Sequence, residues 1–184
     1  VVIPDELVLR NTGLRDDDGL FVTDTRTGRT ELIASIRKLV TDGVPPSERE
    51  DFEAMENYAF HCKWNLQADR LMITIRRKPS GHPEDFNVAD HGEMFFDVFT
   101  CRPDGSEIRR AVPWPVWKKG GHHTTFFPNG HQLSMNVNLH GNGMVLMKVN
   151  YDGSGFEPIT EALPGSGHPT VHADGRHILT DTYT

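Results

Sequence analysis

Residues 121–133, GHHTTFFPNGHQL, and residues 167–179, GHPTVHADGRHIL, decide the fold, because the second stretch repeats the first 46 residues later. Each stretch opens with Gly-His, continues through a Thr, turns at Asn-Gly or Asp-Gly, and ends in an apolar run. Asn-Gly and Asp-Gly supply the positive φ angles that a two-residue β-hairpin requires. The repetition therefore predicts successive β-hairpins built on one plan.

Further repeats indicate the period of the pattern. Asp152-Gly153-Ser154 follows a strand-like run, as Asp104-Gly105-Ser106 does 48 residues earlier. Residues 60–72, FHCKWNLQADRLM, form a weaker third copy, and residues 19–24 lead into an earlier turn at Thr27-Gly28. A period in the forties that contains four strand-length runs is typical of a β-propeller blade.

We therefore predict an all-β fold of about three to four β-propeller blades, each a four-stranded antiparallel sheet. Known propellers close with about four to eight blades. The chain would then be one segment of a larger propeller, and its open edges would pair with the rest of the propeller or with another copy. The predicted parts of this single segment are a partial blade at 1–44, a blade at 58–112, a blade at 121–162 and a partial blade at 167–184.

One short helix is predicted near residues 32–40. Its apolar residues recur at i, i+1, i+4, i+7 and i+8, as they do on one face of a helix. These residues are Leu32, Ile33, Ile36, Leu39 and Val40. The stretch 45–51 that follows begins with two prolines and is mostly charged, so a surface loop is expected there.

Composition limits the classes of partner. The chain has 184 residues and a net charge of −7, which argues against nucleic acid, because phosphate binding requires clustered Lys and Arg. No run approaches the roughly 18 apolar residues of a membrane helix, so no membrane partner is expected. The first residues show neither an initiator Met nor the basic region of a signal peptide, so a processed end is expected, from which a targeting segment could have been removed. The location is left open, with a preference for the cytoplasm. Cys62 and Cys101 are expected to be free thiols.

Histidines recur at one position of the repeat. Those that stand several residues before a first hairpin turn are His61, His122 or His123, and His168. The first strand of each propeller blade lines the central channel, so these side chains would converge at one mouth of it and could bind manganese or zinc. His172, four residues after His168, would project from the same side of its strand and join the metal site. In the alternative interpretation the histidines are structural and hydrogen-bond to turns or neighbouring blades.

Other side chains have two interpretations each. Four aromatic residues could stack on a sugar ring or fill the space between blades: Trp64, Trp114, Trp117 and Phe126. The remaining histidines are expected in solvated loops or turns: His82, His91, His131, His140 and His177.

Residues 165–183, GSGHPTVHADGRHILTDTY, together with the other blade openings, resemble the blades of oligogalacturonate lyases and related bacterial proteins with Trp-Asp-like repeats. The resemblance implies part of a seven-bladed propeller, in which three histidines and a glutamine hold a manganese ion that assists β-elimination on a uronate. It also implies that His168 and His122 are metal ligands. The family's further His and Gln just upstream of the late-blade His have no counterpart at residues 163–166, LPGS.

Elimination from a uronate requires a cation near the carboxylate and a base that takes the α-proton. Lys63 and His123 are the candidate catalytic residues, with Lys118 and Lys119 as further cations. The expected function is thus metal-dependent β-elimination on uronate oligosaccharides. The alternative is a propeller without catalytic activity that binds a small ligand or a protein partner at its mouth.

Overall fold

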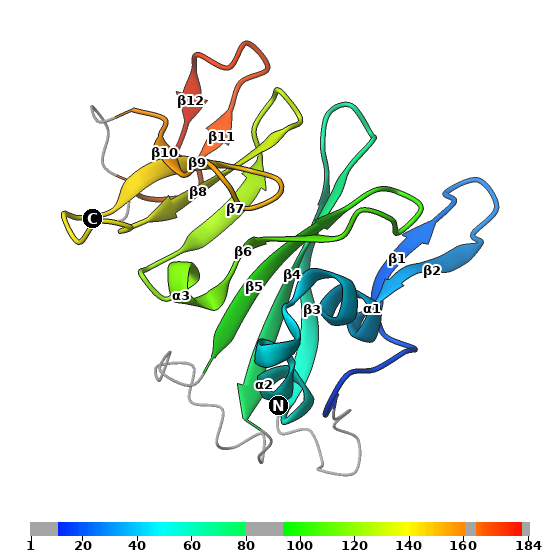
Figure 1. Ribbon diagram of the computed structural model, residues 1–184. Coiled ribbons are helices and arrows are strands. Elements are labelled where there is room, and N and C mark those ends of the chain that lie inside the picture. The colour runs from blue at the N-terminus through cyan, green and yellow to red at the C-terminus, as the bar shows by residue number, and fades with distance from the viewer. Residues whose placement is uncertain (1–10, 80–93, 161–164, 182–184) are drawn as a thin grey trace, which may run out of the picture.

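The computed structural model describes residues 11–79, 94–160 and 165–181, and most of the regular structure in these residues is β-strand. The strands form four antiparallel sheets, each built from strands that follow one another in the chain. Within the described residues the sheets form an open array and do not close into a barrel (Figure 1). The expected antiparallel β architecture is therefore confirmed.

The first sheet is the hairpin of β1 (Gly19–Thr23) and β2 (Thr30–Ser35), which leads directly into α1 (Ile36–Gly43). The prediction of a helix from residue 32 was wrong at its start, because residues 32–35 belong to β2. The Ser35 hydroxyl begins the helix by accepting a hydrogen bond from the backbone N–H of Lys38 at 3.0 Å. Both the end of β2 and the start of α1 bury apolar side chains in the same core, so the pattern is continuous across the boundary.

Three short helical segments were not predicted. The 3-10 turn η2 (Pro46–Glu48) and helix α2 (Arg49–Glu53) lie in the stretch expected to be a surface loop. Phe52 explains this difference, because its buried ring anchors α2 in the core despite the charged residues around it. The third segment is α3 (Trp114–Trp117), which lies in the chain between the two four-stranded sheets.

Two four-stranded antiparallel meanders make up the middle of the chain. The β3–β6 sheet contains β3 (Met55–Trp64), β4 (Leu71–Pro79), β5 (Phe95–Cys101) and β6 (Arg109–Val112). The β7–β10 sheet contains β7 (His122–Phe126), β8 (Gln132–Val137), β9 (Val145–Asn150) and β10 (Glu157–Pro158). The last described sheet is the hairpin of β11 (Thr170–Val171) and β12 (Ile178–Leu179).

One turn geometry joins the first two strands of the last three sheets. In each turn, the backbone N–H of one residue donates to the carbonyl of the residue five positions later, and the residue three positions later has a positive φ. The donors and acceptors are Asn65 and Arg70, Phe127 and Gln132, and His172 and His177. The residues with positive φ are Ala68, Gly130 and Gly175. Equivalent positions in the three sheets can therefore be counted from these turns.

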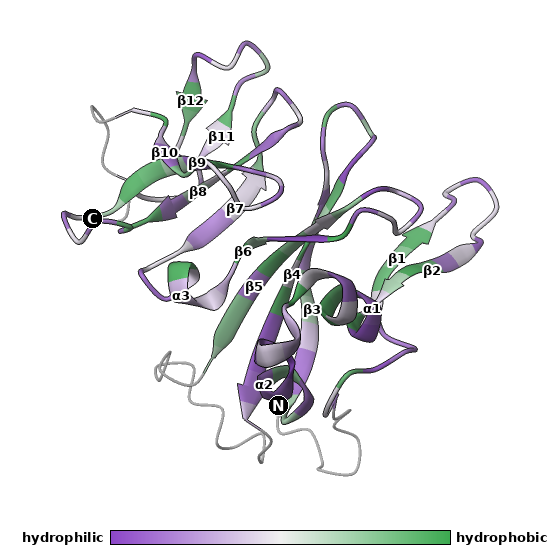
Figure 2. Ribbon diagram, viewed as in Figure 1, coloured by the Kyte–Doolittle hydropathy of each residue, from purple (hydrophilic) through white to green (hydrophobic). Residues whose placement is uncertain are grey.

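The β3–β6 sheet has a hydrophobic core on each face, because successive side chains of a strand point to opposite sides. Leu71, Ile73 and Ile75 of β4 pack in the core that contains α1, α2 and the β1–β2 hairpin. Met72, between them, packs in the core that the sheet shares with the β7–β10 sheet. Figure 2 shows the hydrophobic stretches along β5 and β9 that belong to these cores.

Polar contacts bring the first strands of the two meanders together. The Lys63 ammonium at the end of β3 donates to the carbonyl of Thr124 in β7 at 2.8 Å. In the turn that follows β3, the Gln67 side chain donates to the Pro128 carbonyl at 3.0 Å. The two first strands and their turns therefore lie side by side.

Two further expectations can be compared with the structure. Cys62 and Cys101 are both free thiols, and burial raises the pKa of Cys101 to about 11. Among the described residues, the helices are all too short or too polar to cross a bilayer.

Replacing Phe99 tests the core between the β3–β6 sheet and α1. The ring is fully buried and lies against Gly43 at the end of α1. Phe99→Ala is expected to lower the free energy of unfolding by about 3–5 kcal/mol, because the cavity would be closed only in part. Phe21→Ala in β1 is the control, with a ring that is 46% exposed and an expected loss of less than about 1 kcal/mol. Chemical denaturation measures both values, and equal losses would contradict the assigned core.

Candidate histidine site

Two histidines occupy β-bulges in the first strands of the meanders. His61 is the extra residue in β3, where the register with β4 shifts, and its φ is 55°. His123 lies in the register shift between His122 and Thr125 of β7, and its φ is also 55°. Residues other than glycine seldom adopt a positive φ, and a bulge re-aims the side chain of its extra residue. The two rings are therefore presented in the same unusual way.

The bulged histidines and His168 stand at equal distances from equivalent turns. Each lies four residues before the residue whose N–H opens its turn, and the pairs are His61 and Asn65, His123 and Phe127, and His168 and His172. The sequence left His122 and His123 as alternatives for the second position, and counting from the turn selects His123. The turns at Phe127 and His172 are 45 residues apart, which is the separation of His123 from His168, whereas His122 and His168 are 46 residues apart.

Three imidazoles lie together in space. The ring centroids of His123 and His168 are 3.9 Å apart, and those of His122 and His123 are 4.6 Å apart. Lys63 reaches the same region from β3, and both it and His61 act electrostatically on His123. We call His61, Lys63, His122, His123 and His168 the histidine cluster.

The cluster disfavours positive charge. Burial lowers the pKa of His123 to about 4, with further lowering by His122, His168, Lys63 and His61. Desolvation also lowers the pKa of His122, with a smaller effect of His168, and the pKa of Lys63. Partial desolvation and then Lys63 lower the pKa of the otherwise exposed His61. At neutral pH the rings of His61, His122 and His123 are therefore neutral bases beside a partly desolvated ammonium.

Two residues that the sequence analysis missed orient the rings. Asp181, after β12, accepts a hydrogen bond from the His168 backbone N–H at 2.5 Å, and its other oxygen lies 3.0 Å from Nδ1 of His168. Asn136 of β8 is fully buried and pairs in register with His122, with its amide nitrogen 3.4 Å from Nδ1 of that ring. The hairpin register could have indicated Asn136, whereas no sequence spacing links Asp181 to His168.

The donor chemistry of the cluster fits a divalent transition metal. Neighbouring imidazoles are suitable ligands, and a carboxylate on Nδ1, as on His168, favours Nε2 as the ligand atom. Ring rotation would be needed to bring the ligand atoms together. In the described part of the chain, a group of three with all ligand atoms within 4.8 Å occurs only at His172, Asp174 and His177.

The remaining candidates lie in other surroundings. His172 is in the β11–β12 turn, where it pairs with Asp174, which also pairs with His177. His82 and His91 lie outside the described residues, and His131, His140 and His177 are exposed as expected. Lys118 and Lys119 are exposed residues that follow α3.

The aromatic candidates divide between core and surface. Trp117 stacks on Phe96 and packs, with Phe126, against the core shared by the two meanders. Trp114 contacts the ring of Phe95. Trp64, at the end of β3, is 49% exposed and is the most accessible of the four candidates.

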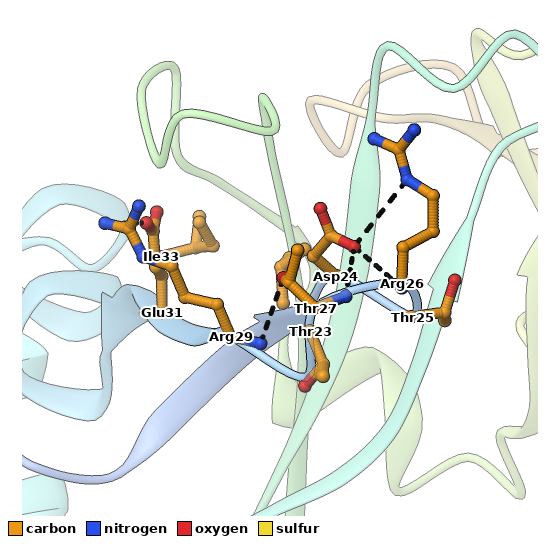
Figure 3. A pocket seen from close by; sticks show the side chains of 9 residues that line it. Thr23, Asp24, Thr25, Arg26, Thr27, Arg29, Glu31 and Ile33 are labelled. Carbon is orange, nitrogen blue, oxygen red and sulfur yellow. Dashed lines mark hydrogen bonds and ion pairs between the residues drawn. The ribbon is translucent and has the colours of Figure 1, made fainter.

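A surface hollow of about 650 Å³ lies away from the cluster, on the β1–β2 hairpin (Figure 3). Its polar groups satisfy one another, because Arg29 pairs with Glu31 at 2.6 Å and Asp24 accepts the backbone N–H groups of Arg26 and Thr27. The hollow contains none of the predicted site residues, so it does not compete with the cluster as a functional site.

Comparison with known proteins adds no family. No protein-family model matches the chain, and no curated protein matches it. A proposed function therefore rests on the chemistry of the site.

Acidification tests the environment of His123. The folded pKa of about 4 lies below the ordinary value of 6.5, so the unfolded chain binds more protons between these two pH values. The contribution of His123 to stability is thus complete above pH 6.5 and is lost as the pH falls through 4. NMR of ring nitrogens should show His123 still neutral at pH 5. In His168→Asn the midpoint should rise, because one repelling imidazole is gone, and an ordinary midpoint in both proteins would contradict this environment.

Proposed function

We propose that the four sheets are β-propeller blades and that the histidine cluster binds an acidic sugar for metal-assisted β-elimination, as in oligogalacturonate lyases. The observation that supports this proposal is the convergence of Lys63, His123 and His168 from three successive sheets. In a propeller, equivalent positions of successive blades surround one channel. A ligand at the cluster would therefore lie at a channel mouth.

The electrostatics of the cluster suit a carboxylate ligand. Burial of Lys63, His122 and His123 makes their charged forms unfavourable, and an incoming anion would offset that penalty. Lys63 donates to the Thr124 carbonyl, which holds its ammonium next to the bulge of His123. The uronate carboxylate would bind to Lys63.

His123 would act as the base. Its lowered pKa keeps the ring neutral at pH 7, so that it can accept a proton. In the elimination the ring takes the proton from the carbon beside the carboxylate, and that electron pair forms a carbon–carbon double bond. The bond to the neighbouring glycosidic oxygen breaks, and the released oxygen takes a proton from water.

His122 and His168 would hold the metal, because both rings lie next to that of His123. His123 itself would then remain uncoordinated and available for proton transfer. A bound manganese or zinc ion would supply positive charge that acidifies the α-proton. Asp181 would orient the His168 ring through Nδ1. The Asn136 amide donates to Nδ1 of His122, so His122 would have to give up this hydrogen bond and change tautomer to bind the metal through Nε2.

One observation favours the alternative of a binding propeller without catalysis. The Asn136 amide beside His122 also donates to the carbonyl of Gly167 at 3.1 Å, which ties β8 to the segment that carries His168. Such ties are what a structural role of the histidines would require. The same cluster would then bind a small ligand or a protein partner without reaction.

Turnover of oligogalacturonate with added Mn²⁺ separates these functions. His123→Asn is expected to lower kcat by about 100-fold or more, because the base is lost, while Asn tolerates the positive φ of the bulge. Lys63→Met is expected to raise KM about tenfold through loss of a charge-assisted contact. The control is His140→Ala, an exposed residue outside the cluster, which should leave both values unchanged.

Formation of the unsaturated product is followed by ultraviolet absorbance, and binding by calorimetry. Uronate binding without turnover would support the binding alternative. Equal turnover by the protein and its His123→Asn variant would overturn the proposed base.

A further inference from the structure

The turn between β11 and β12 gathers three metal-ligating side chains. Ligand atoms of His172, Asp174 and His177 all lie within 4.8 Å of one another. The three residues belong to one six-residue segment, so binding an ion would order little additional chain. All three are exposed, which leaves room for water at further coordination positions.

One carboxylate oxygen of Asp174 faces both imidazoles. Oδ2 lies 2.6 Å from Nδ1 of His177 and 3.1 Å from Nδ1 of His172. Oδ1 accepts the backbone N–H groups of Arg176 and His177 at 2.8 and 3.2 Å, which fixes the carboxylate. The rings lie at 77° to each other. Two nitrogens and one oxygen are therefore close together before any ion binds.

The equivalent turn between β7 and β8 shows that this fold does not require the triad. There the corresponding positions hold Phe127, Asn129 and Gln132. Asn129 accepts the N–H groups of His131 and Gln132, and its amide donates to the Gln132 side chain at 2.9 Å. A neutral set of side chains closes the same turn, so turn formation alone does not account for two histidines and a carboxylate at these positions.

His172 and His177 share one anionic partner. Nδ1 of His172 lies 3.1 Å from Oδ2 of Asp174, so the two side chains can share a hydrogen bond, as His177 and Asp174 do at 2.6 Å. A divalent ion that replaced the ring protons at these nitrogens would keep the carboxylate paired with positive charge.

We propose that the β11–β12 turn binds one divalent first-row transition metal ion, such as zinc or cobalt, through Nδ1 of His172, Nδ1 of His177 and Oδ2 of Asp174. Two imidazoles and a carboxylate suit these ions better than calcium or magnesium, which prefer oxygen ligands. The site is separate from the histidine cluster and does not depend on its proposed function. Bound metal would clamp the two strands of the short hairpin together.

Zn²⁺ titration of the protein, followed by NMR of the histidine rings and by calorimetry, tests the site. The signals of His172 and His177 should shift together at one equivalent of the ion. The variants His172→Phe, Asp174→Asn and His177→Gln each install the residue that the β7–β8 turn carries, so the turn is expected to form. Each should weaken binding at this site at least about tenfold, and the triple variant should remove one equivalent of bound ion.

The matched control is His168→Asn, which alters the histidine cluster and should leave the shifts of His172 and His177 unchanged. Circular dichroism and metal-free thermal unfolding check that the triple variant folds as the parent does. The proposal is overturned if the triple variant binds as many equivalents as the parent, or if His172 and His177 fail to respond to Zn²⁺. Loss of oligogalacturonate turnover in cluster variants would not affect this result, so the two proposals fail independently.

Discussion

Burial of both faces of the β3–β6 sheet is the constraint on which the described structure depends. Leu71, Ile73 and Ile75 face α1 and the first hairpin, while Met72 faces the β7–β10 sheet, so neither neighbour can be removed without exposing apolar surface. This packing sets β3 beside β7. The contact of Lys63 with the Thr124 carbonyl, and with it the assembly of the histidine cluster, follows from that placement.

The sequence predicts where the hairpins turn, because turn residues act locally. The prediction of two-residue turns was wrong: within these turns only Gly130 and Gly175 have a positive φ, and four residues separate Phe127 from Gln132 and His172 from His177. The proximity of His123 and His168 could also be predicted, because residues the same number of positions before equivalent turns lie at the same height in neighbouring sheets.

Other features depend on tertiary contacts that no short pattern records. The start of α1 at Ile36 could not be placed, because strand and helix bury residues in one core. The bulge at His123 is visible only as a shift in pairing with β8. His172 was grouped with His168 by strand alternation, but only Thr170 and Val171 between them lie in a strand, so alternation does not determine the direction of the His172 side chain.

The bulge at His123 also bears on how such a site can evolve. Phe126 and Thr125 pair with β8 beyond the bulge, and His122 pairs with it before the bulge, so the extra residue is absorbed within a few positions. Deletion of a single codon would return β7 to regular pairing while the hairpin persisted. The same deletion would remove the ring that adjoins both His122 and His168. A lineage could therefore gain or lose the chemistry of this site in one in-frame step without giving up the fold.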